Sequence, residues 1–210
     1  GGRLWPETAA LLTWFAAPLV AAILTDATVY NNFRQFLFVT PPLFVFAGVA
    51  FEAVTVRIRS TAAVGLIATA TLLPGILGIV RLHPYEYVYY NALVGGVEGA
   101  FRSYEMDYWC TSYREGMAWI NEMGPPDAEV AVAPPGHVAQ HYARSDLSIV
   151  FAQSAEDLDD RQPIYGLGCG RGNNDLGFFP EYGVAHEVAI QGARLAVIRD
   201  FQQPDNAGQD

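Results

Sequence analysis

The sequence has 210 residues, of which 51% are apolar, and its formal net charge is −10. Residues 1–96 carry five Arg and four acidic residues, whereas residues 97–210 carry seven Arg and eighteen acidic residues. An acidic C-terminal half without a basic cluster argues against nucleic-acid binding. The two cysteines, Cys110 and Cys169, are too few for a disulfide scaffold and lack zinc spacing, so they form either one disulfide or two separate buried thiols.

Three long apolar segments occupy the first half of the chain. They are residues 8–25, 36–56 and 61–80. Each has about the length needed to cross a hydrocarbon core of ~30 Å at ~1.5 Å per residue. Buried helices of a soluble core are the alternative, but soluble domains rarely contain three such stretches within ninety residues. We therefore predict a transmembrane region over residues 1–96 with three C-terminal transmembrane helices of a larger membrane protein.

Residues 97–210 have the pattern of a small α/β domain. Ser112 and Glu115 have the spacing of a capping box, and the helix they predict ends at Gly124. Short apolar runs at residues 129–133 and 147–152 predict strands, with a helix over 136–143 between them.

The end of this domain contains a hairpin and a glycine-rich segment. Residues 187–191 and 195–199 flank a turn centred on Gly192 and predict two antiparallel strands. The segment GLGCGRG, residues 166–172, lacks the spacing of a dinucleotide-binding turn and is predicted to be a flexible loop.

The short loops predict the orientation of the membrane region. Arg57 and Arg59 lie between the second and third apolar segments, and Arg3 precedes the first. Because positive residues favour the cytoplasmic side, everything after Arg81 is expected to face outward. This predicts a multi-pass protein of the plasma (inner) membrane with an extracytoplasmic C-terminal domain.

The loop between the first two apolar segments holds one candidate site. Arg34 follows Tyr30, Asn31 and Asn32 there, at the expected outer membrane face. A guanidinium group can grip a phosphate in fork geometry while amides contact a sugar. The alternative is that Arg34 anchors the chain to lipid headgroups.

A second candidate site follows the third apolar segment. His83 stands close to Glu86, as in groups that transfer protons, and Tyr85 and Tyr87 flank that carboxylate. An interfacial aromatic belt with a polar turn is the alternative interpretation and the one that the sequence favours. Glu105 and Asp107 are spaced like two ligands of a metal site, but the sequence offers no third ligand.

Three segments in order resemble the C-terminal part of bacterial family-39-like membrane glycosyltransferases. The segments are YNNFRQFLFVTPPL (30–43), RLHPYEYVYYNALVGG (81–96) and YEMDYWCTSYREGMAWIN (104–121). This family belongs to the GT-C superfamily and is related to the protein O-mannosyltransferases and the lipid A aminoarabinose transferases. The sequence departs from the commoner family pattern at Gln35, where His is frequent, and at Cys110, where Gly is usual.

The resemblance implies an inverting transferase that takes a sugar from a polyprenyl-phosphate carrier at the outer membrane face. It implies that Arg34 holds the carrier phosphate, with Tyr30, Asn31 and Asn32 near the sugar and His83, Tyr85 and Tyr87 at the outer mouth. The implied partners are membrane lipid, the polyprenyl-phosphate sugar donor and an N-terminal half of the protein.

The resemblance also implies that the catalytic carboxylate lies in an early loop for which these residues offer no match. We therefore expect no catalytic residue and no cofactor or metal site in this piece, and no transfer by it alone; a divalent cation, if one is used, belongs to the full enzyme. The competing interpretation is a non-enzymatic, membrane-anchored binding domain. An acidic first outward loop and six or more further spans upstream would favour the enzyme.

Overall fold

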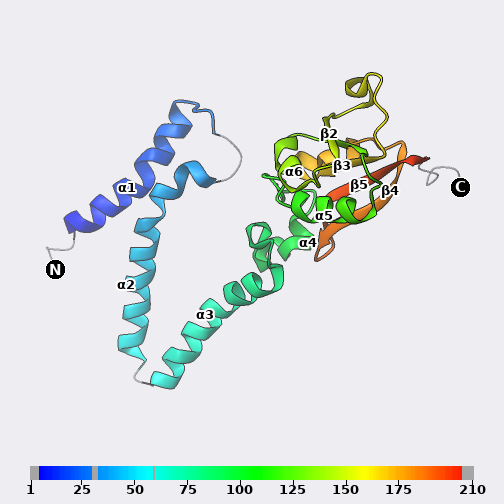
Figure 1. The fold of residues 1–210 in the computed structure, drawn as a ribbon. Coiled ribbons are helices and arrows are strands. Elements are labelled where there is room, and N and C mark those ends of the chain that lie inside the picture. The colour runs from blue at the N-terminus through cyan, green and yellow to red at the C-terminus, as the bar shows by residue number, and fades with distance from the viewer. Residues whose placement is uncertain (1–4, 30–32, 59, 205–210) are drawn as a thin grey trace, which may run out of the picture. The chain divides into compact units, whose positions relative to one another are not determined.

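The computed structural model describes residues 5–29, 33–58 and 60–204, and the chain divides into two compact units, Gly1–Ile76 and Leu77–Asp210. We describe each unit by itself. Figure 1 shows the N-terminal unit as helices alone and the C-terminal unit as helices around a sheet. The second unit begins at Leu77, whereas the sequence analysis divides the chain at residue 96.

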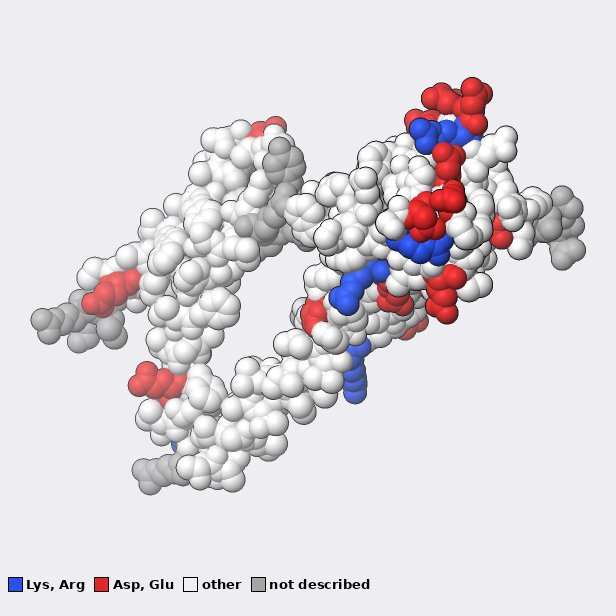
Figure 2. All heavy atoms as spheres, viewed as in Figure 1, with Lys and Arg blue, Asp and Glu red and all other residues white. Residues whose placement is uncertain are grey.

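The N-terminal unit consists of apolar helices with almost no core. They are α1 (Trp5–Leu24), the 3₁₀-helix η1 (Phe33–Val39), α2 (Pro41–Arg57) and α3 (Thr61–Leu82), which continues into the second unit. α1 contacts η1 and α2, yet no residue of α1 is buried. The face of these helices visible in Figure 2 carries few charges. Helices that expose this much apolar surface need an apolar surrounding or a further protein surface.

Among the described residues, two helices rather than three are long and apolar enough to cross a membrane: α1, near the N-terminus, and α3. The fold predicted from the sequence, three transmembrane helices and then a small α/β extracytoplasmic domain, is therefore wrong. The error lies at residues 36–56. Residues 36–39 belong to η1, and α2 starts only at Pro41, because proline lacks the backbone N–H and suits the first helical turn. The 17 residues of α2 span about 26 Å at ~1.5 Å per residue, short of a ~30 Å core.

The C-terminal unit contains a mixed five-stranded sheet in the order β2-β1-β3-β5-β4. The strands are β1 (Glu129–Val132), β2 (Ser148–Phe151), β3 (Tyr165–Cys169), β4 (Tyr182–Ile190) and β5 (Ala193–Pro204). β1 pairs in parallel with β2 and β3, and β5 pairs antiparallel with β3 and β4. The predicted strands at 129–133 and 147–152 and the predicted hairpin are confirmed.

Helices cover the sheet on both faces. They are α4 (Gly96–Ala100), α5 (Tyr113–Met123), α6 (Gly136–Tyr142) and α7 (Asn174–Gly177). α5 contacts β3, β4 and β5, and α7 contacts β3. Successive residues of β1 alternate between two cores: Val130 and Val132 belong to the larger one, whereas Ala131 belongs to the smaller one. The sheet is therefore buried from both sides, as the side-chain period of two requires.

Residues 166–169 of the glycine-rich segment lie in the central strand β3, so their prediction as a flexible loop is wrong. A Cβ at Gly168 would lie 2.7 Å from the ring of Phe178, and one at Gly166 would lie 2.8 Å from Phe201. The two glycines leave room for these rings, which supply the apolar surface that the strand itself lacks. Because the packing comes from distant residues, a hydropathy pattern cannot detect this strand.

The residues that follow α3 belong to the core of the second unit. Leu82, Tyr85 and Val88 are 2%, 7% and 0% exposed and lie in the larger core with Met117 and Ile120 of α5. Two 3₁₀-helices, η2 (Glu86–Val88) and η3 (Ala92–Val94), carry the chain from there to α4. The core thus fixes the position of the second candidate site.

Candidate functional site

The structure places three of the seven predicted site residues. Tyr30, Asn31 and Asn32 lie outside the described residues, and so does the side chain of Arg34, although its backbone begins η1. Their assignment to a carrier site stays a prediction. His83, Tyr85 and Tyr87 are all described and lie in one segment directly after α3, between Leu82 and the first turn of η2.

His83 is held by a neighbouring carboxylate. Its Nδ1 lies 2.6 Å from Oε1 of Glu86, and its side chain is 76% exposed. A hydrogen bond from its own backbone and the contact with His83 hold the pKa of Glu86 below its usual value. Because Nδ1 faces Glu86, the opposite ring nitrogen, Nε2, is the one that remains for a ligand.

Tyr85 is buried, and its hydroxyl donates a hydrogen bond of 2.5 Å to Oε2 of Glu115 on α5. Burial raises the pKa of Tyr85, and the hydrogen bond with Glu115 and the charge of that carboxylate raise it further. The phenol therefore stays neutral at physiological pH. It acts as a fixed donor to Glu115.

Tyr87 points its hydroxyl at a second carboxylate. It donates to Oδ1 of Asp107 at 3.0 Å and accepts a short hydrogen bond from Oγ1 of Thr111. Burial of the hydroxyl, followed by the charge of Asp107, raises the pKa of Tyr87. Tyr85 and Tyr87 thus reach carboxylates on either side of the start of α5.

Asp107 stabilises the start of α5 and is fully buried. Its oxygens accept the backbone N–H groups of Thr111 at 2.9 Å and Ser112 at 3.1 Å, and a short hydrogen bond from the Ser112 hydroxyl. Ser112 makes no side-chain cap of its own helix, so the predicted capping box with Glu115 is wrong. Asp107 instead binds the two residues directly before the helix, while the first N–H groups of α5 donate to the backbone carbonyls of residues 110–112.

The segment directly after α3 and the first turns of α5 line a cavity of about 510 Å³, which we call the α5 pocket. Its lining comes from His83, Pro84, Tyr85, Thr111, Arg114 and Glu115, with Ala118 and Tyr142 completing it. Two of the segments that carry the family resemblance, residues 81–96 and 104–121, therefore meet in one cavity. Its volume falls in the range of small-ligand sites.

Arg114 is the exposed cation of the α5 pocket and forms no ion pair with any described residue. Its guanidinium offers several N–H donors in fork geometry, and the Thr111 hydroxyl and His83 lie on the same lining. The cavity also holds two acceptors, the carboxylate of Glu115 and the oxygen of Thr111, whose hydroxyl hydrogen is donated to Tyr87. A cation beside these acceptors suits a ligand that carries both an anionic group and hydroxyls. Arg114 lies within a segment read only as a helix, so the sequence analysis missed it as a site residue.

Glu105 and Asp107 do not form a metal site with other side chains. In the described part of the chain, no three His, Cys, Asp or Glu residues lie close enough together to hold a metal ion. Oε1 of Glu105 accepts the backbone N–H of Gly172 at 3.0 Å, while Asp107 is occupied at α5. The two carboxylates serve different parts of the fold.

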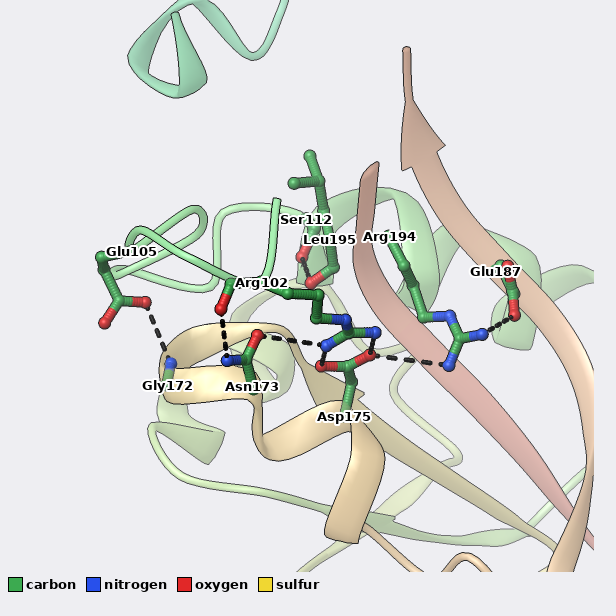
Figure 3. A network of polar contacts seen from close by, with 9 residues as sticks. All are labelled: Arg102, Glu105, Ser112, Gly172, Asn173, Asp175, Glu187, Arg194 and Leu195. Atoms are coloured by element: carbon green, nitrogen blue, oxygen red, sulfur yellow. Dashed lines mark hydrogen bonds and ion pairs between the residues drawn. The ribbon is translucent and has the colours of Figure 1, made fainter. Parts of the chain in front are cut away.

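A buried network of charges connects the same region to the β4–β5 hairpin (Figure 3). Arg102 grips Asp175 through two hydrogen bonds of 2.7 Å, and Arg194 lies 3.5 Å from the same carboxylate and 2.7 Å from Glu187. Asp175 is fully buried, so its pairing with Arg102 is required by desolvation. A disulfide between Cys110 and Cys169 ties the loop before α5 to β3.

Comparisons with protein-family models, with curated proteins and with solved structures found no match for this chain. The resemblance to membrane glycosyltransferases therefore rests on the three sequence segments.

Proposed function

We propose that this chain forms the C-terminal part of a membrane glycosyltransferase that uses a polyprenyl-phosphate sugar, and that the α5 pocket binds the phosphate end of that lipid. The observation that carries the proposal is the meeting of residues 81–96 and 104–121 in one cavity. These segments carry the resemblance, and they are separated in sequence. A shared cavity is what a ligand-binding role for both requires.

The chemistry of the lining supports this choice of ligand. Arg114 supplies the fork geometry that matches phosphate oxygens. Glu115 is engaged by Tyr85 and is left with acceptor capacity that suits a sugar hydroxyl. The cavity follows directly after α3, one of the two helices long enough to cross a membrane, so a lipid phosphate would lie close to its own bilayer.

The disulfide supports an extracytoplasmic location for the second unit, since disulfides persist mainly in oxidising compartments. We propose the plasma (inner) membrane as the site of action, with the C-terminal unit outside. Arg34, with Tyr30, Asn31 and Asn32, stays part of the proposal as a second contact to the carrier.

The test is the binding of polyprenyl phosphate to the full chain in lipid nanodiscs, measured by native mass spectrometry or by competition with a fluorescent analogue. We expect Arg114→Gln to weaken binding about tenfold and Arg114→Lys to weaken it less, because an ion pair with phosphate is worth ~1.5–3 kcal/mol. Arg171→Gln is the control: Arg171 packs over the ring of Tyr108, 4.4 Å from its centroid, and does not line the pocket.

Equal affinity in all three variants would remove the α5 pocket from carrier binding. If the Arg114 variants keep their affinity and Arg34→Ala loses it, the phosphate binds at the loop before α2 instead. No binding by the unaltered chain would favour the non-enzymatic alternative, a membrane-anchored binding domain.

A further inference from the structure

A second cavity of this unit lies between the connection that leads into β3, the start of β4 and the last part of β5. Its volume is about 330 Å³, and we call it the aromatic pocket. Tyr182, Phe201 and Ile164 form its apolar wall, and Arg161, Gln162 and Gln202 form its polar rim. None of these residues belongs to the α5 pocket.

The apolar wall is built from stacked rings. The ring centroids of Tyr182 and Phe201 lie 4.5 Å apart with an interplanar angle of 26°, and Phe179 packs 4.8 Å from Phe201 on the core side. The β4–β5 register shifts between Tyr182 and Gly183. Such irregularities change the direction of side chains at the end of a strand pair. Here the irregularity lies next to Tyr182, a residue of the aromatic wall.

The wall is held in place by a buried cation. Arg199 is 6% exposed, and it donates from Nη1 to the carbonyl oxygen of Tyr182 at 2.9 Å and from Nε to that of Phe178 at 3.3 Å. The backbone N–H of Phe201 donates to Ile164 at 2.9 Å, which joins the two sides of the cavity. Both sides are therefore fixed before any ligand arrives, which lowers the entropic cost of binding.

The polar rim offers hydrogen-bonding groups with little net charge. The side-chain amides of Gln162 and Gln202 are exposed and make no hydrogen bond with other described residues. Arg161 is 53% exposed, and its Nη1 lies 3.1 Å from Glu129, so its charge is already compensated. Free amides combine donors and acceptors, whereas a compensated guanidinium attracts an anion only weakly.

We propose that the aromatic pocket binds one neutral sugar unit of a glycan. A pyranose ring has an apolar face of C–H groups, which packs on the negative face of an aromatic ring, and a rim of hydroxyls that pair with amides. The cavity has both parts in the matching arrangement, with the rings as the wall and the amides at the rim. A purely apolar ligand would leave the amides without partners, and a phosphorylated one would lack a free cation.

The volume fits this occupant. It lies near the lower end of the range for small-ligand sites, which suits one ring and excludes a folded peptide segment. The proposal does not rest on the proposed function, because the two cavities share no residue.

The test is saturation-transfer difference NMR on the full chain in nanodiscs, with cellobiose, maltose, α-mannobiose and chitobiose as probes. We expect at least one disaccharide to receive saturation at its ring protons, with a Kd of about 1 mM, as suits a small shallow site. Tyr182→Leu keeps the bulk of the side chain but removes the ring face, so it should raise that Kd roughly five- to tenfold. Gln202→Ala should raise it about threefold or more, since it removes one neutral hydrogen bond.

Gln203→Ala is the matched control, because Gln203 is the next exposed residue of β5 and does not line the cavity. Inorganic phosphate at the same concentration should not compete. The absence of saturation transfer to all four probes would overturn the proposal, as would equal binding by the Tyr182→Leu, Gln202→Ala and Gln203→Ala variants. Displacement by phosphate would reassign the cavity to an anion.

Discussion

The hydroxyl of Tyr85 donates a hydrogen bond of 2.5 Å to Oε2 of Glu115, which joins the segment after α3 to the first turns of α5. Tyr85 is 7% exposed, so this contact also closes one side of the α5 pocket. Hydrogen bonds to charged groups contribute about 1.5–3 kcal/mol, and an acceptor open to water contributes toward the lower end.

Tyr85→Phe is expected to lower the stability of the second unit by about 1–2 kcal/mol, since it removes this hydrogen bond and keeps the ring. Thermal unfolding of the full chain in micelles, followed by near-ultraviolet circular dichroism, measures the change. Tyr89→Phe is the control, because the Tyr89 ring is 42% exposed and its hydroxyl makes no hydrogen bond with described residues. Equal unfolding temperatures for both variants would mean that the contact adds nothing to stability.

Alkaline pH should destabilise the second unit. Burial, as the largest cause, raises the pKa of Tyr85, Tyr87 and Tyr113 in the folded chain above the ordinary value of 10.0. Above pH 10 these tyrosines ionise in the unfolded chain but stay protonated in the folded one. Their contribution is therefore complete below pH 10 and is lost as the pH rises toward the folded-state pKa, at up to about 1.4 kcal/mol per pH unit for each tyrosine.

Denaturant unfolding at a series of pH values measures this slope. The variant Tyr113→Phe should flatten it, because Tyr113 is fully buried and donates to the Ala133 carbonyl at 2.8 Å. A stability that stays constant between pH 9 and pH 11 would contradict the raised pKa values.

Loss of the disulfide should be costly. Cys110 and Cys169 are separated by 59 positions in sequence, and closing a loop of that length in the unfolded chain corresponds to ~4 kcal/mol in the chain-entropy model. The paired variant Cys110→Ala, Cys169→Ala should therefore unfold at a clearly lower denaturant concentration. Thiol alkylation before and after reduction is the companion measurement; rapid labelling of both cysteines without a reductant would show that the bond is absent.

A polypeptide of residues 77–210 is expected to be more stable than one of residues 97–210. The shorter piece lacks Leu82, Tyr85 and Val88, and burying an apolar side chain of this size contributes about 1.5–3 kcal/mol. A loss of this size is comparable with the whole stability of many domains. Circular dichroism and size-exclusion chromatography without detergent compare the two pieces, and identical unfolding curves would place residues 77–96 outside the core.

Local patterns predicted the elements whose packing is visible in their own residues. α5 follows from its apolar spacing and the stop at Gly124, and β1, β2 and the β4–β5 hairpin follow from short apolar runs. β3 was missed because its glycines are packed by Phe178 and Phe201, which lie later in the chain. The second span was overestimated because its composition was counted across Pro41, where the helix begins.

The candidate site likewise contains residues that the sequence pointed to and residues that only the packing brings together. His83 and Tyr85 were predicted because they stand next to a long apolar segment in an aromatic run. Arg114 was predicted only as a helical position and Glu115 only as part of a capping box. Their place in the pocket depends on how α5 packs against the segment that contains Tyr85. Asp107 was noticed as one of two neighbouring carboxylates, and its partners are the backbone amides of Thr111 and Ser112, directly before α5. Sequence spacing can identify such residues, but it does not identify their hydrogen-bond partners.

The disulfide encloses the most exposed connection of the second unit, residues 153–162, which projects from the domain in Figure 1. Exposed connections of this kind are where proteases cut first. A single cut there would leave both pieces covalently joined and each still paired in the sheet, β1 and β2 on one side and β3 to β5 on the other. Nicked protein would therefore migrate as one band on a non-reducing gel and as two after reduction, so a proteolytic cut there would be invisible until the bond is reduced.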